Sequence, residues 1–340
     1  MATVTSKYNT LLDLAKETDG TGKLLPIVEM MSEVNSIVQD LPMIQCNSGL
    51  FHKAVVRSGV PEGTFRKIYG GVNPEKTERT AVTDTTCMLE AFSEVDEAVA
   101  LRSGNANLYR LREAKGFIEG LAQSMAKVLF YGDLKTNPEQ INGFSARYNK
   151  YGTDKKKASW NVINGGGTSS DNTSIWLINW GSDLVTGLYP TGARTKIGIC
   201  HDPIGRKVKE ASDGSYMVLL DHFIAEFGLH IADWRRACRI ANIKTGDFGT
   251  AQAADILSLM RKATYRIPGA PTNQVSGKLC WYMNAEALEE LERQYYAQTN
   301  MQLFLQNGDG HPIATYRGIP IRLVEQLKSD EATVASASAR

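Results

Sequence analysis

One short run of the chain, Cys200-His201-Asp202, combines residue types that could perform covalent chemistry. A thiol beside an imidazole could act as a nucleophile with its general base, although such a pair also needs a third group to orient the base. Neighbouring residues on a strand point to opposite faces, so Cys200 and His201 would meet only if a turn at Asp202-Pro203 redirected them. We interpret the run as a buried cysteine beside turn-capping side chains. A cytosolic hydrolase that uses Cys200 and His201 is the alternative function.

The other candidate motifs do not support catalysis or metal binding. His222 and His230 share a strand face but would lie about 26 Å apart, too far to hold one ion. Thr21-Gly22-Lys23 resembles the end of a phosphate-binding loop, but the earlier glycine and the following Ser or Thr are missing. Gly165-Gly166-Gly167 lacks the spacing of a dinucleotide site. We therefore predict no catalytic, cofactor-binding or metal-binding residues and no cofactor.

The composition is that of a folded protein with little net charge. Its 340 residues are 42% hydrophobic and 22% charged, and the formal net charge is +1. No block of like charge is longer than Lys155-Lys156-Lys157, which argues against a dedicated binder of nucleic acid or of an anionic membrane. The five scattered cysteines form no C-x-x-C pair, and the sequence has no signal peptide and no membrane-length apolar run. The sequence predicts a soluble protein made in the cytosol.

The segment between Leu50 and Ala100 predicts a projecting arm. Phe51–Arg57 and Thr80–Phe92 have the alternation of strands, and a long polar stretch with several Gly and Pro residues separates them. A two-stranded arm of this length could reach about 60 Å. Because an isolated two-stranded ribbon is marginally stable in water, such an arm needs a neighbour to lie on.

The N-terminal region and one long helix come next in importance. Helical patterns near Lys7–Lys16 and Ile27–Leu41 form an N-terminal arm, whose apolar stripe docks either on the protein's own core or under a neighbouring subunit. Asn105–Asp133 predicts a helix about 40 Å long that Gly132 ends. Within it, Gly116 and Gly120 indicate either close packing against another backbone or a bend point.

The remaining elements predict an α+β fold rather than a regular βαβ series. Two further helices are expected, Ala251–Ala263 capped by Thr250 and Ala285–Gln298 capped by Asn284. The tail Ser329–Arg340 is low in complexity and is expected to be mobile unless a partner holds it. The further expected strands are Ile175–Trp180, Lys196–Cys200, Phe223–Ile231, Trp234–Ile243, Lys278–Met283 and Ile319–Val324.

Several short motifs follow one another in an order that resembles a known family. They are Gly63–Tyr69 in the arm, Met88–Asp96 before the long helix, Ile175–Trp180, Gly187–Pro190, Gly228-Leu229, Asp233–Arg235, Arg239–Ile243, Tyr282–Asn284 and Tyr316–Ile321. Together they span most of residues 50–325, and their order and spacing resemble the major capsid proteins of tailed bacteriophages, the Johnson fold. The resemblance is strongest to a short-tailed-phage subgroup.

The resemblance implies a division of the chain. It implies an N-terminal arm at 1–48, an extended β-arm at 49–98 and a C-terminal tail at 329–340. It also implies a peripheral domain at 99–160 and 216–245, with the spine helix 105–133 and a long β-hairpin at Tyr216–Ile243. The axial domain would be 161–215 with 246–328. In the family this hairpin usually follows the Met-Asn helix and the Gly-Ile-Pro strand, so the strand order can be permuted here.

The resemblance further implies a structural protein, not an enzyme, that self-assembles into pentamers and hexamers of an icosahedral head. The head would enclose double-stranded DNA without sequence specificity, and scaffold, portal and decoration proteins are candidate partners, with no membrane involved. Assembly would take place in the host cytoplasm and leave the protein in the virion capsid. Gly116 and Gly120 are the candidate hinge of the spine. The residues expected at contacts between subunits are Phe65, Arg66, Lys67, Ile68, Tyr69 and Lys76 of the β-arm, and Met30, Val34 and Ile37 of the N-terminal arm.

Overall fold

The computed structural model describes residues 36–59, 61, 63–194, 198–212, 214–272, 275–297, 305–308 and 311–337. The helix expected near Lys7–Lys16, most of the one expected at Ile27–Leu41, and the candidate contact residues Met30 and Val34 lie outside these ranges.

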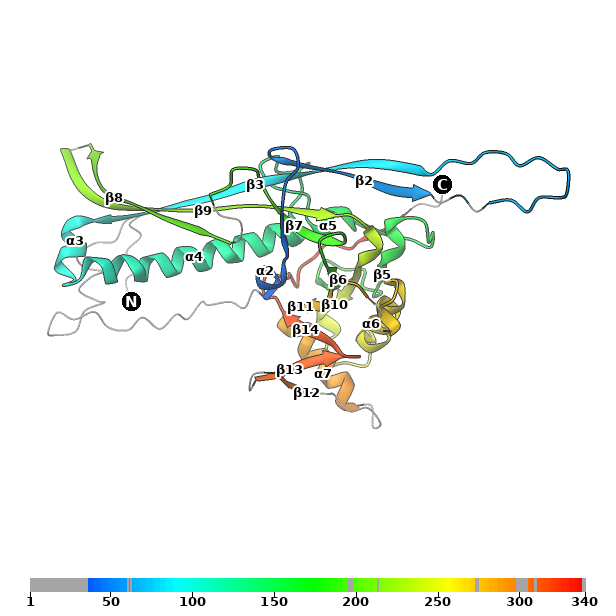
Figure 1. Ribbon diagram of the computed structural model, residues 1–340. Coiled ribbons are helices and arrows are strands. Elements are labelled where there is room, and N and C mark those ends of the chain that lie inside the picture. Colours follow the sequence, from blue (N-terminus) through cyan, green and yellow to red (C-terminus); the bar gives the residue numbers. More distant parts are fainter. Residues whose placement is uncertain are drawn as a thin grey trace.

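The described chain has a compact part from which two projections run in opposite directions (Figure 1). One projection is the arm formed by β2 (Phe51–Gly59) and β3 (Glu78–Asp96). The other is a ribbon of β3, β8 (Cys200–Ala211) and β9 (Gly214–Ile231) that lies along the helix α4 (Ala106–Tyr131). In the described residues one continuous sheet of 13 strands joins both projections to the compact part. The predicted α+β class is therefore confirmed.

The compact part is built around β6 (Asn172–Trp180), every residue of which is buried. β10 (Ala237–Lys244) and β11 (Lys278–Met283) pair with it on either side, both antiparallel. Because strand side chains alternate between faces, Trp176 and Ile178 enter one hydrophobic cluster while Ile175 and Leu177 enter another. β6 therefore contributes side chains to both hydrophobic clusters, one on each of its faces.

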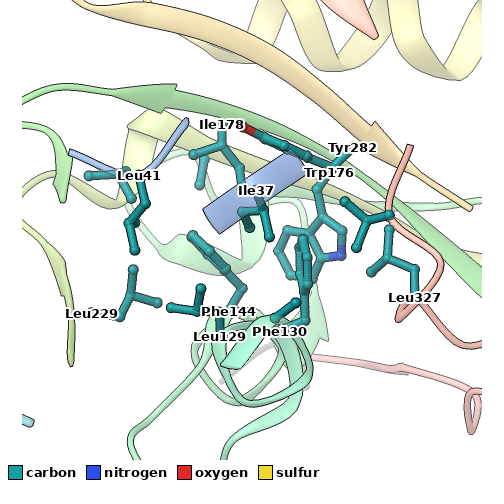
Figure 2. Packing of buried hydrophobic residues seen from close by; sticks show 14 of the residues in the cluster. Ile37, Leu41, Leu129, Phe130, Phe144, Trp176, Ile178, Leu229, Tyr282 and Leu327 are labelled. Carbon is teal, nitrogen blue, oxygen red and sulfur yellow. The ribbon is translucent and has the colours of Figure 1, made fainter. Parts of the chain in front are cut away.

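The first cluster lies between the sheet and the end of α4 and is rich in aromatic side chains (Figure 2). The Phe130 ring lies 5.9 Å from that of Trp176, and the Phe144 ring lies 5.6 Å from the same indole. Within this core the indole N–H of Trp180 donates to the Tyr282 hydroxyl at 2.7 Å. Ile37 and Leu41 of the N-terminal region fill the same cluster.

The second cluster is covered by the helices α6 (Ile256–Arg266) and α7 (Ala285–Ala297). The predicted Asn284 cap of α7 is confirmed, since its side chain accepts a bond from the Ala287 amide at 3.0 Å. The predicted start of α6 is wrong. Thr250 instead caps a local turn through the Gln252 amide, and the helix begins only after Asp255, whose side chain accepts from the Ser258 amide. Both residue types cap well, so the sequence alone did not distinguish the two positions.

The long helix is confirmed within two residues of its expected bounds. The Asn105 side chain caps its start through the Leu108 amide at 3.1 Å, and Gly132 ends it. A Cβ at Gly132 would lie 2.4 Å from the Ile141 carbonyl oxygen, so only glycine fits this close approach. The short helix α3 (Glu97–Arg102) precedes α4 and packs with it under the ribbon.

The predicted long hairpin at Tyr216–Ile243 is wrong, although both of its strands exist, as β9 and β10. β9 forms its hairpin with β8, which precedes it, while β10 leaves to pair with β6. Pro203 and the charged residues of β8 hid this strand from sequence analysis. The pairing tolerates them because the register shifts between Pro203 and Gly205, which forms a bulge, and because one side of the strand is exposed.

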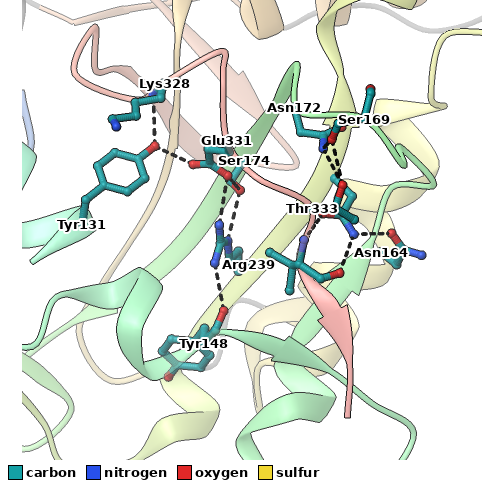
Figure 3. A network of polar contacts seen from close by, with 12 residues as sticks. Tyr131, Tyr148, Asn164, Ser169, Asn172, Ser174, Arg239, Lys328, Glu331 and Thr333 are labelled. Carbon is teal, nitrogen blue, oxygen red and sulfur yellow. Dashed lines mark hydrogen bonds and ion pairs between the residues drawn. The ribbon is translucent and has the colours of Figure 1, made fainter. Parts of the chain in front are cut away.

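The C-terminal tail is packed against the body, so the expectation of a mobile tail is wrong over residues 329–337. Glu331 forms an ion pair with Arg239 at 2.9 Å, and both side chains are about 95% buried. Tyr131 and Ser174 donate hydrogen bonds to the same carboxylate (Figure 3). This anchor joins residues 92 positions apart, which no local pattern reveals.

Shorter elements complete the fold. They are α2 (Ser36–Asp40), β1 (Met43–Gln45), α5 (Phe144–Arg147), β4 (Lys150–Tyr151), β5 (Val162–Asn164), β7 (Val185–Tyr189), β12 (Leu305–Gly308), β13 (His311–Tyr316), β14 (Ile319–Leu323) and β15 (Ala335–Ser336). β15 pairs with β4 and fixes the end of the tail.

The buried ion pair provides a first test. Glu331→Ala leaves the Arg239 guanidinium buried without its counter-charge, so we expect the unassembled protein to lose about 3–5 kcal/mol of unfolding free energy. Denaturant titration measures this loss. The exposed Glu325→Ala is the control and should change stability by less than about 0.5 kcal/mol. Equal effects of the two substitutions would contradict the proposed anchor.

Candidate functional site: the arm, its root and the spine

The loop of the arm leaves its three largest apolar side chains almost completely exposed. Phe65 is 107% exposed, Ile68 85% and Tyr69 100%, relative to the same residues in an extended chain. The Gly70 amide donates to the Lys67 carbonyl at 3.0 Å and closes a turn whose corner residue Tyr69 has a φ of 68°. Covering one side chain of this kind is worth about 1.5–3 kcal/mol. The described part of the chain supplies no cover, so this surface is available to another molecule.

The charged residues expected to act with this loop lie on the same projection. Arg66, Lys67 and Lys76 are all exposed. Ile37 is different, because it is fully buried in the chain's own core beside α4 and therefore has no surface left for a neighbour. Its expected role as a contact between subunits is wrong, since Ile37 packs in the core of its own chain.

A buried polar cluster holds the root of the arm. Asp84 lies on β3, next to the point where β3 passes from its pairing with β2 to its pairing with β9. Its carboxylate lies 2.6 Å from His230 Nδ1 and accepts a bond from Arg147 Nη2 at 2.7 Å. Arg147 also donates to the Leu229 carbonyl, and the His52 ring lies 4.7 Å from that of His230. Side chains of β9 and α5 therefore meet at one carboxylate of β3, and the His52 side chain of β2 packs on the same histidine.

The electrostatics of this root follow from burial and from these partners. Burial alone would raise the pKa of Asp84, but the hydrogen bonds from His230 and Arg147 hold it below its usual range. Burial, and then the nearby His230, lower the pKa of His52 below 6.5. The folded state therefore favours an ionised Asp84 and a neutral His52.

A second carboxylate joins the ribbon to the spine. Arg110 of α4 binds Asp221 of β9 with two hydrogen bonds, of 2.9 and 2.7 Å. His201 lies 2.9 Å from the same carboxylate and stacks on Phe223 at 4.7 Å between ring centroids. His201 thus serves as a structural link from β8 to β9.

The hydrolase alternative has no support in this geometry. Cys200 and His201 are consecutive residues of β8, paired with Ile224 and Phe223, so their side chains point to opposite faces. In the described ranges no three His, Cys, Asp or Glu side chains are grouped as metal ligands would be. No helix in the same ranges is long and apolar enough to span a membrane.

The spine helix carries features that sequence analysis only partly resolved. α4 is continuous through Gly116 and Gly120, and a Cβ built at either glycine meets nothing within 4 Å. Close packing of these glycines against another backbone of the same chain is therefore wrong. Leu108, Leu111 and Ile118 belong to an apolar stripe at helical spacing along α4, yet they are 40–58% exposed. The helical period identified the stripe but not whether the chain itself covers it.

The residues that sequence analysis missed are those of the arm root. Asp84, Arg147 and His230 are far apart in the chain, and no motif joins them. Asp84 and His230 are polar residues at buried strand positions, and His230 was considered only as a metal ligand. Arg147 is partly buried on the short helix α5 and gave no signal of its own. Assigning alternate residues of β3 and β9 to the buried and exposed faces of each strand could have shown that Asp84 lies on a buried face.

Comparison with known proteins relates this chain to capsid proteins of bacteriophages. The family model for the major capsid protein GP7 matches residues 19–335. A chain from the near-atomic structure of bacteriophage epsilon15 is 29% identical, with a TM-score of 0.74, over 98% of this chain and 100% of that one. A chain of the bacteriophage JBD30 capsid is 10% identical over 94% and 99% of the two chains, with a TM-score of 0.47. A search of curated proteins finds no match.

Because the family model covers most of its length, the chain belongs to the family of the major capsid protein GP7. Its role is structural, as a major capsid protein of a bacteriophage, and its fold is that of the tailed-phage capsid proteins. The resemblance stated from the sequence is confirmed. The arm, the root and the spine are thus parts of a capsid subunit.

The lowered pKa of His52 gives a test of the arm root. Its neutral form stabilises the fold fully above a pH of about 6.5, and this contribution is lost as the pH falls through that value toward the folded-state pKa. Between pH 7.5 and pH 5, we expect the unfolding free energy of the His52→Gln variant to fall by less than that of the wild-type protein. Denaturant titrations of the unassembled protein at both pH values measure this difference. An unchanged pH dependence would contradict the assignment of an acid-sensitive root.

The spine glycines give a separate test. Since nothing opposes a Cβ at Gly116 or Gly120, each change to Ala should raise the unfolding free energy by about 0.5–1 kcal/mol. Gly132→Ala is the matched control and should destabilise the protein, because its Cβ would clash with backbone. Thermal unfolding of the unassembled variants measures both the expected gain in stability and the expected loss. A loss of stability at Gly116 and Gly120 would mean that the helix needs a bend there.

Proposed function

We propose that this chain builds the icosahedral head of a tailed bacteriophage by closing into pentamers and hexamers of itself. The observation that carries the proposal is the fully exposed loop containing Phe65, Ile68 and Tyr69 on a long arm. Exposed apolar side chains gathered in this way mark a surface that another molecule covers, because removing them from water is favourable. Phe65, Arg66, Lys67, Ile68, Tyr69 and Lys76 are the proposed contacts of the arm with the next subunit.

Repetition supplies the strength of the shell. Closed symmetry turns one contact into many identical ones, and a subunit held at several edges gains avidity that no single contact provides. The net charge of +1 suits many copies side by side, because near-neutral subunits repel one another weakly. Met30 and Val34 of the N-terminal arm are proposed as a second contact.

The proposed division of the subunit is that implied by the resemblance, with residues 1–48 and 49–98 as the two arms. A peripheral domain at 99–160 and 216–245 surrounds the spine, and an axial domain at 161–215 and 246–328 contains α6 and α7. The one change that we propose to this division is to count β8, which falls within 161–215, with the peripheral domain, because it pairs with β9. Gly116 and Gly120 are a proposed hinge of the spine, consistent with the open space beside both. The protein has no enzymatic role in this proposal.

The proposed setting is the host cytoplasm, where the shell assembles before it holds double-stranded DNA. The shell retains DNA through closure, without sequence-specific contacts. Scaffold, portal and decoration proteins are the proposed additional partners. The shell then forms the outer part of the virion.

The exposed loop provides the test of the proposal. We expect the triple variant Phe65→Ser, Ile68→Ser, Tyr69→Ser to remain soluble and folded while it forms at least about tenfold fewer shells, because the lost apolar cover is worth several kcal/mol. Electron microscopy and sedimentation of the expressed protein, alone or with the phage scaffold, measure shells.

Two polar changes on the same arm, Thr64→Ser with Glu78→Gln, are the matched control and should assemble as the wild type does. Shells formed normally by the triple variant would contradict the proposal. Wild-type protein that stays at subunit mass under all conditions would contradict it as well.

A further inference from the structure

Three strands of the compact part run in the same direction and give it two distinct ends. β11 is parallel to β14, and β10 and β11 are both antiparallel to β6, so β10, β11 and β14 share one amino end and one carboxyl end. The residues of β10 separate these ends by about 26 Å. The charges of the loops and helices at the two ends differ in sign.

The carboxyl end is acidic. Glu286, Glu289 and Glu292 lie on the exposed side of α7, which follows β11, and Glu325 is exposed after β14. Three cations near this end already have partners. Lys244 pairs with Asp247, Arg293 pairs with Glu290, and the exposed Lys328 has its ammonium 5.5 Å from the Tyr131 ring centre. Between α7 and the loop Thr245–Gly249 lies a hollow of about 470 Å³ that is lined by Glu286, Glu289, Glu290 and Arg293.

The amino end is basic. α6 runs back along β10, because Arg266 near its end donates to the Val162 carbonyl at 3.1 Å, and Val162 pairs with Arg239 in the first half of β10. The exposed Arg261 lies at the middle of α6, and the exposed Lys262 begins its second half. Arg317, exposed in the turn just before β14, adds a third cation with its guanidinium 5.4 Å from the Tyr265 ring centre.

We infer that the acidic carboxyl end of this layer in one copy receives the basic amino end of the next copy around each ring. The inference rests on the proposed function and names the surfaces that meet within a ring. A contact between two different surfaces of the same chain is heterologous, and such contacts generate closed rings when the rotation between copies closes. The hollow beside α7 gives Arg261 and Arg317 of the neighbour a place to enter.

Charge complementarity favours a second copy of the chain over a nucleic acid as the partner. A nucleic acid would use only the basic end and would leave the acidic end without a role. Exposed ion pairs are individually weak, at about 0.2–1 kcal/mol, so they choose the partner and its orientation rather than supply most of the affinity. High salt screens these ion pairs and should therefore weaken the choice of partner and orientation within a ring.

Charge reversal tests the inference with the full chain. The basic-end variant is Arg261→Glu with Arg317→Glu, and the acidic-end variant is Glu289→Arg with Glu292→Arg. Either variant alone places like charges against each other, and we expect at least about tenfold fewer shells at low salt by electron microscopy. The chain carrying all four changes has both ends reversed and should recover wild-type shells.

Mixing the two double variants makes the test sharper. Each can accept only the other as a neighbour, so a ring must alternate between them and must hold an even number of copies. We expect hexamers and open sheets or tubes from the mixture, without the pentamers that closed shells require. Thermal unfolding of each variant checks that the fold is unchanged.

Two results would overturn the inference. One is wild-type shell formation by either double variant at low salt. The other is a folded four-site variant that forms no shells. Failure of the proposed function has a different signature, in which wild-type protein itself stays at subunit mass, and that result would overturn both.

Discussion

The two halves of β3 are held by different partners, and the parts of the subunit outside its compact core depend on this division. Residues 78–85 pair with β2 in the arm, while residues 86–96 pair with β9 on the spine. Near the junction, Asp84 is bonded to Arg147 and His230, which fixes the direction in which the arm leaves. A buried carboxylate with two such partners is costly to break, so the arm has a defined root and an exposed end.

This arrangement separates a part of the subunit that is complete within one copy from an arm that is not. The compact part completes its own two hydrophobic clusters around β6, and the C-terminal tail closes it through the pair between Arg239 and Glu331. The arm has no such closure. Its aromatic loop and the outer stripe of α4 stay exposed within one copy, as befits a family whose members build shells.

The sequence predicted the elements with strong local signals and failed where distant residues decide. Alternation identified β2 and β3, a short apolar run identified β6, and caps with helical period identified α4 and α7, because these signals lie within one element. The partner of β9 was missed, since β8 has Pro203 and charged residues that only its bulge and exposed side allow. The tail and the arm root were missed because their anchors, Glu331 and Asp84, bind residues far away in the chain. The exposed loop of the arm was predicted, since no apolar partner for it existed nearby in the sequence.

The central claim is that the arm finds its cover on a second copy. A cryo-EM map of the assembled shell at side-chain resolution measures this most directly, through the exposed fractions of Phe65, Ile68 and Tyr69 in the assembly. The account predicts that all three are buried against a neighbouring subunit while the root at Asp84 keeps its contacts. An arm folded onto its own body, or still exposed in the finished shell, would contradict it.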